Sequence, residues 1–360
     1  MATRVWNDET EGDVWLVHPE PYSKDLELDT SYSSDSEATI SSMETIDSAE
    51  IGDYFRVEYG RTFPKYDDLP MALPADPDEI YRLKIQHIAL KKVVGGALDT
   101  LIEAQLAPSP DGRRKCILDV RTQSGIWAEE IAIKFPNVDV KTIDVAPTVP
   151  HYPRPNLHHE VYDIHAGILE PAGSFDIVHA RHTVNMVKDW KSMLREIHRV
   201  LRPGGMLIFG EIDPRLTLPG QYVPALHGSG RRGTSFFEFY RQALVKGGIL
   251  IEASSEIDDW LRPDSDTWNA SPPGFHRLQH RSWEVPTNGL WHPDPVMQEV
   301  GMLMAMNFRE FIGSARPLFL SHGVLDAEFD EWVEAIRQEI RDPMNDTVIR
   351  YHLVTAFKLS

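Results

Sequence analysis

Between residues 115 and 212, short apolar runs alternate with segments of helical periodicity. The runs that we expect to form strands cover residues 116–120, 138–144, 157–163, 175–180 and 206–212. Residues 124–135 and 189–201 have the apolar spacing of helices. Strands that alternate with helices in this way form βαβ units, in which the strands are parallel and the crossovers right-handed. The sequence therefore predicts an α/β fold with a doubly wound, mostly parallel sheet that helices cover on both faces.

A helical lead-in, residues 54–114, precedes this region. Within it we expect a helix over residues 77–94, because Asp76 is a suitable N-cap and Pro77 suits the first helical position. Gly95 follows the last apolar residue of the pattern and should end the helix. The lead-in is therefore expected to cover the main domain with at least one long helix.

The main α/β domain is expected to span residues 115–360, with a variable insert at about 214–295 that is rich in Trp, Pro and His. The remaining elements that the sequence predicts are helices over residues 235–248, 295–312 and 326–341, and strands over residues 275–286 and 351–358. The turn from the second helix of the alternating region into the strand at 206–212 is assigned to Pro203-Gly204-Gly205.

The first 53 residues differ from the rest in charge. They hold 14 acidic side chains against Arg4 and Lys24, a net charge of −12 out of the chain's formal −19. Residues 31–50 include seven serines and offer too little apolar surface to offset the entropy lost on ordering. We expect a solvated acidic tail that is disordered unless it docks, with a segment for phosphorylation or for binding a protein partner as the alternative.

Charge and apolar patterning argue against several classes of function. Binding to a phosphate backbone requires clustered Lys and Arg in excess, so no nucleic-acid partner is expected. No run of about 20 apolar residues is present, so no membrane partner is expected either. Cys116 is the single cysteine, which excludes a disulfide within the chain and a Cys-rich zinc site. The acidic N-terminus is unlike a secretory leader, and we expect a cytoplasmic or nuclear location.

The turn after the first strand of a doubly wound sheet is the usual place for a nucleotide. Here residues 119–125 read DVRTQSG, and the helix that follows supplies free N–H groups and a positive dipole. Asp144, at the end of the second strand, is placed to bind ribose hydroxyls. Asp163, at the end of the third, is placed to meet the amino group of a purine base.

Three longer segments resemble the class I methyltransferases that depend on S-adenosyl-L-methionine (SAM). They are YGRTFPKY with LPADPDEIYRLKIQH (59–66 and 73–87), FDIVHARHTVNMVKDWKSMLREIHRVLRPGGMLIFGEID (175–213) and GLWHPDPVMQEVG (289–301). The likeness spans about residues 54–358 and is strongest to the fungal branch that includes LaeA-type regulators of secondary metabolism. It implies a Rossmann-like, seven-stranded sheet with a lid-like insert, SAM as cofactor, and methyl transfer to a small molecule in fungal specialised metabolism.

The resemblance also implies a set of cofactor-binding residues, namely Tyr81, Asp119, Arg121, Ser124, Gly125, Asp144, Val145, Asp163, Ile164 and Arg181. The chain departs from the family pattern D-x-G-x-G-x-G, because Arg121 and Gln123 replace two glycines. Arg121 either binds the SAM carboxylate in a bidentate manner, or fills the pocket and abolishes SAM binding, or marks a pocket reshaped for another ligand. The purely structural alternative pairs Arg121 with a nearby acid, Glu129 or Glu130.

The substrate is expected beyond the ends of the fourth and fifth strands. His182 is the preferred general base because an imidazole titrates near neutral pH, and Glu211 is the second catalytic candidate. The residues that we expect to contact substrate, several of them as part of a lid, are Asn185, Tyr222, His227, Trp268 and Trp291. Each also has a structural interpretation, as a packing histidine, a capping carboxylate or the aromatic core of an added subdomain. No metal site is expected.

Three functions remain open at this point. The first is a SAM-dependent small-molecule methyltransferase. The second is a methyltransferase-fold enzyme that has lost methylation and catalyses a SAM-independent cyclisation or isomerisation. The third is a non-catalytic regulator. The altered turn at residues 121–125 supports the second and third, and the intact Asp144, Asp163 and fourth-strand segment support the first.

Overall fold

The computed structural model describes residues 2–7, 12–17, 46, 50–65, 73–148, 154–225, 231–268 and 274–359. The chain divides into two compact units, Met1–Thr45 and Ile46–Ser360. The first unit contains an antiparallel hairpin of β1 (Ala2–Asn7) and β2 (Gly12–Val17), which the sequence did not predict. Most of the serine-rich stretch lies outside the described residues, so the character of the acidic tail stays a prediction.

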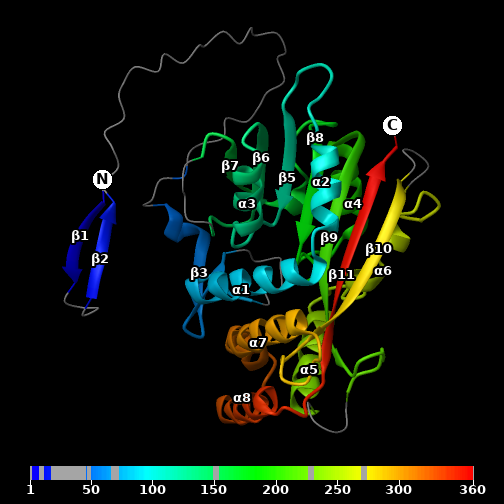
Figure 1. Ribbon diagram of the computed structural model, residues 1–360. Helices are drawn as coiled ribbons and strands as arrows, with labels where there is room; N and C mark the ends of the chain where they lie inside the picture. Colours follow the sequence, from blue (N-terminus) through cyan, green and yellow to red (C-terminus); the bar gives the residue numbers. More distant parts are fainter. Residues whose placement is uncertain are drawn as a thin grey trace. The chain divides into compact units, whose positions relative to one another are not determined.

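The second unit is built on a seven-stranded sheet (Figure 1). Its strands are β5 (Lys115–Val120), β6 (Val138–Asp144), β7 (Leu157–Val161), β8 (Phe175–Arg181), β9 (Leu201–Thr217), β10 (Phe275–Pro286) and β11 (Val348–Lys358). The order across the sheet is β10-β11-β9-β8-β5-β6-β7. Only β11 runs antiparallel to its neighbours in this sheet. The predicted doubly wound, mostly parallel α/β fold is therefore confirmed.

Strand β9 is longer than the sequence predicted. We expected a turn at residues 203–205 and a strand over 206–212, but the strand begins at Leu201 and runs to Thr217. Its register against β8 shifts between Phe175 and Ile177. Gly204 and Gly205 therefore lie in a β-bulge inside the strand and not in a turn before it. Gly204, with a φ angle of 74°, takes the left-handed conformation that such a distortion needs.

Helices cover both faces of the sheet, because successive side chains of a strand point to opposite faces. His179 of β8 stacks on Trp127 of α3 (Ile126–Lys134), with ring centroids 3.7 Å apart. On the other face, Phe209 of β9 packs edge-on against Trp190 of α4 (Trp190–Val200), at 5.6 Å. α2 (Ala97–Gln105) lies in front of the sheet in Figure 1, and α6 (Ala253–Leu261) contacts α4 through Trp260.

A helical cap lies at the carboxyl ends of the parallel strands and consists of α1 (Pro77–Val94), α5 (Arg231–Lys246), α7 (Pro295–Ser321) and α8 (Asp326–Arg341). Figure 1 shows α1, α7 and α8 below the sheet, one under another. Phe236 of α5 stacks on Phe319 of α7 at 4.4 Å, and Phe319 contacts Phe329 of α8 at 5.3 Å. The region predicted as a variable insert, 214–295, contains α5 of the cap, α6 that covers the sheet and the sheet strand β10, and its assignment as an insert stays a prediction.

The start of α1 agrees with the prediction. Asp76 accepts a hydrogen bond from the N–H of Glu79 at 3.1 Å, as an N-cap does. The same carboxylate binds Arg61 through two bonds of 2.5 and 2.7 Å. Arg61 belongs to a hairpin of β3 (Phe55–Glu58) and β4 (Arg61–Pro64), which follows the short helix η1 (Ile51–Tyr54). One acid thus fixes both the hairpin and the helix start.

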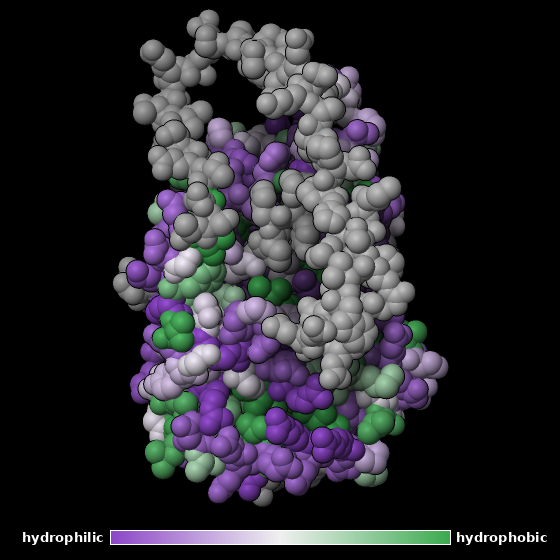
Figure 2. Space-filling view, turned by 90° about the vertical axis from the view of Figure 1, so that its left-hand side faces the viewer, coloured by the Kyte–Doolittle hydropathy of each residue, from purple (hydrophilic) through white to green (hydrophobic). Residues whose placement is uncertain are grey.

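The surface in Figure 2 carries hydrophilic and hydrophobic residues interspersed over the part that grey atoms do not cover. Single exposed apolar side chains, such as Val57 and Ile133, are usual for a protein surface. Within the described parts of the chain, no helix has the length and apolar content that crossing a bilayer requires.

Candidate functional site

The turn after β5 is left-handed at three positions. Arg121, Gln123 and Gly125 have φ angles of 57°, 53° and 70°. This conformation is free of strain for glycine and costs energy for a residue that carries a Cβ atom. The N–H of Arg121 donates to the carbonyl of Ile143 at 2.8 Å, and that of Gly125 donates to Thr122 at 2.9 Å. The two positions that lack glycine therefore keep the backbone that glycine would provide.

The Arg121 side chain reaches from this turn to the loop after β8. Its Nη1 donates to Asn185 Oδ1 at 2.5 Å. When the Gln123 amide is turned so that its oxygen faces the guanidinium, that oxygen accepts from Arg121 at 3.2 Å. Burial lowers the pKa of Arg121, opposed first by Asp144 and then by Glu211. The residue as a whole keeps intermediate exposure.

The two acids that we considered as partners of Arg121 are engaged elsewhere. Glu129 accepts from Arg154 at 2.9 Å, and Glu130 accepts from Lys91 at 2.7 Å. Among the residues that the structure describes, Arg121 forms no ion pair, and its direct partners are amide groups. The guanidinium is therefore a desolvated positive charge without a carboxylate in contact.

Asp144, at the end of β6, closes the turn from the other side. Its Oδ2 accepts from the N–H of Gln123 at 2.9 Å and its Oδ1 from the N–H of Val145 at 2.8 Å. Burial raises the pKa of Asp144, while Arg121 and these two N–H groups favour its charged form. Ser124 is buried in the same turn. Each carboxylate oxygen has two lone pairs, so Asp144 retains acceptor capacity for a further hydroxyl.

Asp163 lies beyond β7 and caps the short helix η2 (Ile164–Ala166). It accepts from the N–H of His165 at 2.8 Å. Its side chain is partly exposed, whereas Ile164 is buried in the hydrophobic core. The Asp163 carboxylate is thus accessible to a ligand from solvent. The Ile164 side chain is buried in the core, so only its backbone could contact a ligand.

The loop after β8 is held by a buried carboxylate. His182 has a φ angle of 55° and donates its N–H to the carbonyl of Gly210 at 3.0 Å. Oε1 of Glu211 accepts from the N–H groups of Thr183 and Val184, the latter at 3.1 Å, and from the Thr183 hydroxyl at 2.9 Å. Burial raises the pKa of Glu211 to about 7 against these hydrogen bonds.

A pocket with about 640 Å³ of empty space, its open mouth included, lies where these groups meet, and we call it the carboxyl-end pocket. Its lining residues are Leu73, Arg82, Leu83, Gln86, Gln123, His182, Val184, Asn185, Glu211, Ile212, Pro214, Phe237, Tyr240, Leu244, Asn307, Phe308, Phe311 and Ile349. Three predicted site residues, His182, Asn185 and Glu211, thus share one pocket with Gln123 of the turn. Burial and the cations Arg181, Arg82 and Arg121 hold the pKa of His182 well below its ordinary value.

Several pocket residues were not predicted, and the polar ones among them come from the cap. Arg82 forms a buried ion pair with Glu79 at 2.6 Å, and its carbonyl accepts from Asn307 of α7 at 3.1 Å. Tyr240 of α5 is buried, and burial raises its pKa. Gln86 lies one helical turn after Arg82. Two long polar side chains four residues apart on an otherwise apolar helix face were the signal available in the sequence.

Asp119 and Arg181 lie apart from this pocket. Asp119 binds His179 at 2.6 Å, and that imidazole stacks on Trp127 of α3. Arg181 donates to Nδ1 of His87 at 2.9 Å. Residues 179 and 181 share one face of β8, and Asp119 of β5 lies next to His179. The Asp119 and Arg181 side chains therefore both face the side of the sheet that α2 and α3 cover. Their expected contact with a cofactor therefore stays a prediction that their orientation does not favour.

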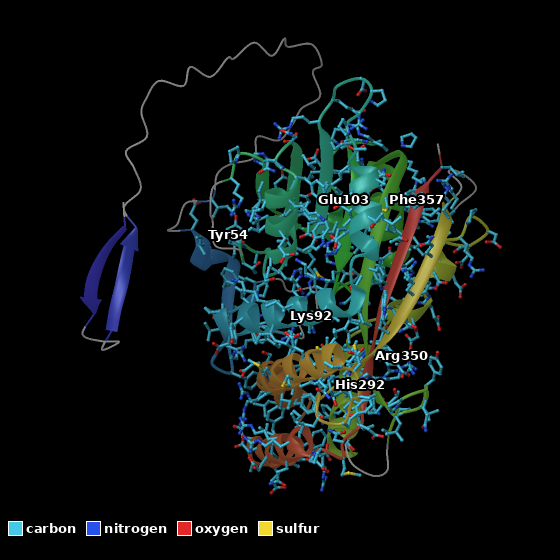
Figure 3. All side chains as sticks on the ribbon, in the orientation of Figure 1. Tyr54, Lys92, Glu103, His292, Arg350 and Phe357 are labelled. Carbon is cyan, nitrogen blue, oxygen red and sulfur yellow. The ribbon has the colours of Figure 1, made fainter. Side chains whose placement is uncertain are left out.

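The aromatic residues expected at the substrate lie outside the carboxyl-end pocket. Tyr222 is 73% exposed and packs over Arg350 at 4.0 Å, beside the end of β11 that Figure 3 labels with Arg350. Trp268 is buried against Phe275, with ring centroids 5.8 Å apart. Trp291 lies against His292 at 5.0 Å. These contacts are those of local packing, the alternative that the sequence left open.

Two remaining predicted residues are also placed away from the pocket or outside the described chain. Tyr81 is on the outer face of α1 and 56% exposed. His227 lies outside the described residues. Within the described ranges, no three side chains of His, Cys, Asp or Glu are grouped as metal ligands would be.

Comparison with known proteins places this geometry in context. The family described as "Methyltransferase domain" matches residues 94–261, which include β5 to β9 and the altered turn. The region thus matched contains Arg121, Asp144, His182 and Glu211.

Two fungal relatives cover most of the chain. The "Secondary metabolism regulator laeA" of Coprinopsis cinerea is 27% identical over 280 residues, 76% of this chain and 67% of that protein. The "Methyltransferase pytC" of Aspergillus terreus is 26% identical over 262 residues, 71% of this chain and 72% of that protein. Among solved structures, phosphoethanolamine N-methyltransferase 2 of Haemonchus contortus, in complex with phosphomonomethylethanolamine and S-adenosylhomocysteine, covers 83% of this chain and 62% of its own. Its TM-score is 0.45 at 16% identity.

Proposed function

Because the chain belongs to the class I SAM-dependent methyltransferase family, in its LaeA-like branch, we propose that it transfers a methyl group from SAM to a small molecule in fungal specialised metabolism. The observation that carries the proposal is the carboxyl-end pocket, in which the turn after β5 and the ends of β8 and β9 meet. In an open α/β sheet, ligands bind at this edge. We place this activity in the cytoplasm or nucleus.

The residues of the turn fit the cofactor. Residues 121, 123 and 125 keep the left-handed backbone, so the chain can still approach a ligand closely there. Asp144 retains acceptor capacity for ribose hydroxyls, and the partly exposed Asp163 would meet the base. Arg121 and Gln123 thus have the left-handed φ angles that glycine adopts without strain.

Arg121 would hold the carboxylate of SAM. A desolvated guanidinium that contacts only amides gains a charge-assisted partner when a carboxylate enters, and its fork matches that group. Asn185 fixes the guanidinium in place and so lowers the entropy cost of binding. The first of the three interpretations of Arg121 is the one that these contacts support.

When bound, SAM supplies an electrophilic methyl group for in-line displacement by the substrate. The chain positions the acceptor in the carboxyl-end pocket and removes its proton. Glu211 is better suited to this task than His182, because a pKa of about 7 matches neutral pH whereas that of His182 lies well below its ordinary value. Oε1 of Glu211 accepts all three hydrogen bonds from the loop. We therefore assign Oε2 as the oxygen that takes the proton of the substrate.

The substrate class follows from the walls of the pocket. Apolar and aromatic side chains, many of them from α5, α7 and β9, form more than half of the lining, and polar groups such as Glu211 and His182 share it. Such a pocket suits a molecule with an apolar body and one ionisable hydroxyl or acidic carbon.

One observation favours a second function. Arg121 and Gln123 both project side chains from positions that are glycine in the family pattern, and Arg121 is tied to Asn185. If the side chains of Arg121 and Gln123 keep SAM out of the turn, the pocket serves either a SAM-independent cyclisation or isomerisation or a non-catalytic regulator.

Thermal unfolding with SAM and with S-adenosylhomocysteine tests the proposal. A ligand at 100 times its dissociation constant stabilises the folded chain by about 2.7 kcal/mol. We expect SAM to raise the melting temperature of the native chain accordingly. The rise should be largely lost in Arg121→Ala and partly retained in Arg121→Lys. A shift that appears only in the double variant Arg121→Gly/Gln123→Gly, or in no variant, contradicts the proposal and favours the second function.

A further inference from the structure

A second cavity lies between α1, α2, α3 and the sheet, and we call it the helix-side cavity. It has about 1160 Å³ of empty space, its mouth included, and shares no lining residue with the carboxyl-end pocket. In Figure 3, Lys92 and Glu103 mark the two helices, α1 and α2, that wall it on one side. The helix-side cavity is therefore a separate space of the same unit.

Arg181 brings a positive charge into this cavity. Its described polar contact is a 2.9 Å hydrogen bond to Nδ1 of His87. Because Arg181 donates there, His87 carries its proton on Nε2 and donates it to Glu130, 3.1 Å away. Burial lowers the pKa of His87 to about 4, so at neutral pH the ring carries no charge. Among the described residues, no carboxylate lies within ion-pair distance of Arg181.

Tyr351 adds a hydroxyl next to Arg181. Gly210 of β9 lies between the two, since a Cβ atom at Gly210 would be 2.2 Å from Tyr351 Oη and 3.6 Å from Arg181 Cγ. The Tyr351 hydroxyl has no hydrogen-bond partner among the described residues, although the side chain is 4% exposed and lines the cavity. A cation and a hydroxyl donor therefore lie side by side without an anion between them.

The rest of the cavity is largely apolar. Its walls are formed by side chains from three helices and β11, among them Leu90, Leu98, Ile102, Trp127, Ile131 and Leu353. The other buried ionisable pair in the lining is already satisfied, because His179 binds Asp119 at 2.6 Å. The other charged side chains of the lining pair with each other, Lys91 with Glu130 at 2.7 Å and Lys134 with Asp99 at 3.2 Å, so Arg181 is the lining charge that the described residues leave without an ion pair. The space thus suits one negative charge on an apolar body.

We propose that the helix-side cavity binds a monocarboxylic acid with an apolar body, whose carboxylate pairs with Arg181 and accepts from Tyr351. An isolated guanidinium binds a carboxylate through two parallel hydrogen bonds. Burying the apolar body against α1, α2 and α3 supplies the remaining affinity. This inference does not depend on methyl transfer, and its test uses no cofactor.

Isothermal titration of the full-length chain with decanoate, and with decan-1-ol as the uncharged control, tests the proposal. We expect decanoate to bind more tightly than decan-1-ol. Arg181→Gln should weaken decanoate binding about tenfold, and Tyr351→Phe should weaken it by a smaller factor. Arg309→Gln removes the same charge from an exposed site on α7 and should leave binding unchanged.

A pair of variants at an exposed position of the lining makes the test independent of how well Arg181→Gln folds. Ile133 is 57% exposed, so Ile133→Glu and Ile133→Gln are both tolerated, and only the former adds a negative charge. We expect decanoate to bind Ile133→Glu more weakly than Ile133→Gln, with no such difference for decan-1-ol. Equal binding of decanoate and decan-1-ol, wild-type affinity in Arg181→Gln, tighter binding of decyl phosphate than of decanoate, or no binding at all would overturn the proposal.

Discussion

At the scale of single residues, the turn after β5 has a backbone conformation typical of glycine at two positions that carry long side chains. Arg121 and Gln123 adopt φ angles of 57° and 53°, which L-residues rarely take. Strain of this kind persists where the surroundings fix the conformation, and it concentrates at functional sites. Here Asp144 fixes it, by accepting the N–H of Gln123 at 2.9 Å.

Substitution of Gln123 tests this strain. A β-branched residue is especially unfavourable in the left-handed region, so Gln123→Val should lower the free energy of unfolding by about 1–3 kcal/mol. Gln123→Gly relieves the strain, but glycine loses more conformational entropy on folding, at a cost of similar size. The free energy of unfolding of this variant should therefore stay within about 1 kcal/mol of that of the native chain. Urea denaturation measures both. Equal stability of the two variants would show that the position is not held left-handed.

Glu211 gives a pH-dependent prediction. Its pKa rises from an ordinary 4.5 to about 7 on folding, so between these values the folded chain holds a proton that the unfolded chain has lost. The stability that this proton provides is fully present below pH 4.5 and is lost as pH rises through 7. The free energy of unfolding of Glu211→Gln should therefore increase relative to the native chain across this window and then level off. A constant difference from pH 4.5 to 8 would contradict the raised pKa.

At the scale of elements, α7 depends on a close approach to the segment after β10. A Cβ atom on Gly301 would lie 2.4 Å from the carbonyl carbon of Asn288 and 2.4 Å from the nitrogen of Gly289, both backbone atoms. Backbone atoms yield less than the end of a side chain, so a small residue is required at this crossing.

Gly301→Ala should consequently destabilise the chain by about 1–3 kcal/mol. Gly313 in the same helix is the matched control, because it is exposed and a Cβ atom there meets nothing within 4 Å. Gly313→Ala should stabilise by about 0.5–1 kcal/mol through helix propensity. Thermal and urea unfolding compare the two, and similar effects from both would show that α7 does not pack as described.

The elements that sequence predicted well are those with strong local signals. The helix at 77–94 has an N-cap, a proline at its first position and a glycine at its end, and its bounds were correct. The nine-residue helix α2 was missed because it starts directly after Gly95-Gly96, which we took as a stop. β9 was predicted too short, because a bulge can absorb glycines that otherwise indicate a turn.

The candidate site was predictable to a similar extent. His182 and Asn185 follow β8 as predicted, whereas Glu211, predicted at the end of a strand, lies within β9 because that strand continues to Thr217. All three nevertheless line the carboxyl-end pocket. The side of the sheet that Asp119 and Arg181 face was not predictable, because buried parallel strands are apolar on both faces. Arg82, Tyr240 and Asn307 come from three helices far apart in sequence, and only tertiary packing brings them together.

At the scale of the whole molecule, the seven-stranded sheet supports two cavities in different places. The carboxyl-end pocket is closed by the cap helices, and the helix-side cavity is covered by α1, α2 and α3. α1 contributes to both, through Arg82 to the first and through His87 to the second. Arg181 and His182, adjacent in sequence, point into different cavities.

Deletion of residues 1–45 tests the division into units. Residues 46–360 contain the complete sheet and cap as one compact unit. The shortened chain should therefore unfold within about 2 °C of the native chain, a difference that corresponds to roughly 1 kcal/mol for a unit of this size. A larger fall in the calorimetric Tm would show that the first unit stabilises the second.

A crystal structure of the native chain soaked with S-adenosylhomocysteine tests the central claim most directly. We predict that the ligand carboxylate lies within hydrogen-bond distance of the Arg121 guanidinium and that Asp144 accepts from the ribose. A crystal in which Arg121 remains bound to Asn185, with no adenosyl compound at the turn after soaking at saturating concentration, would contradict the account.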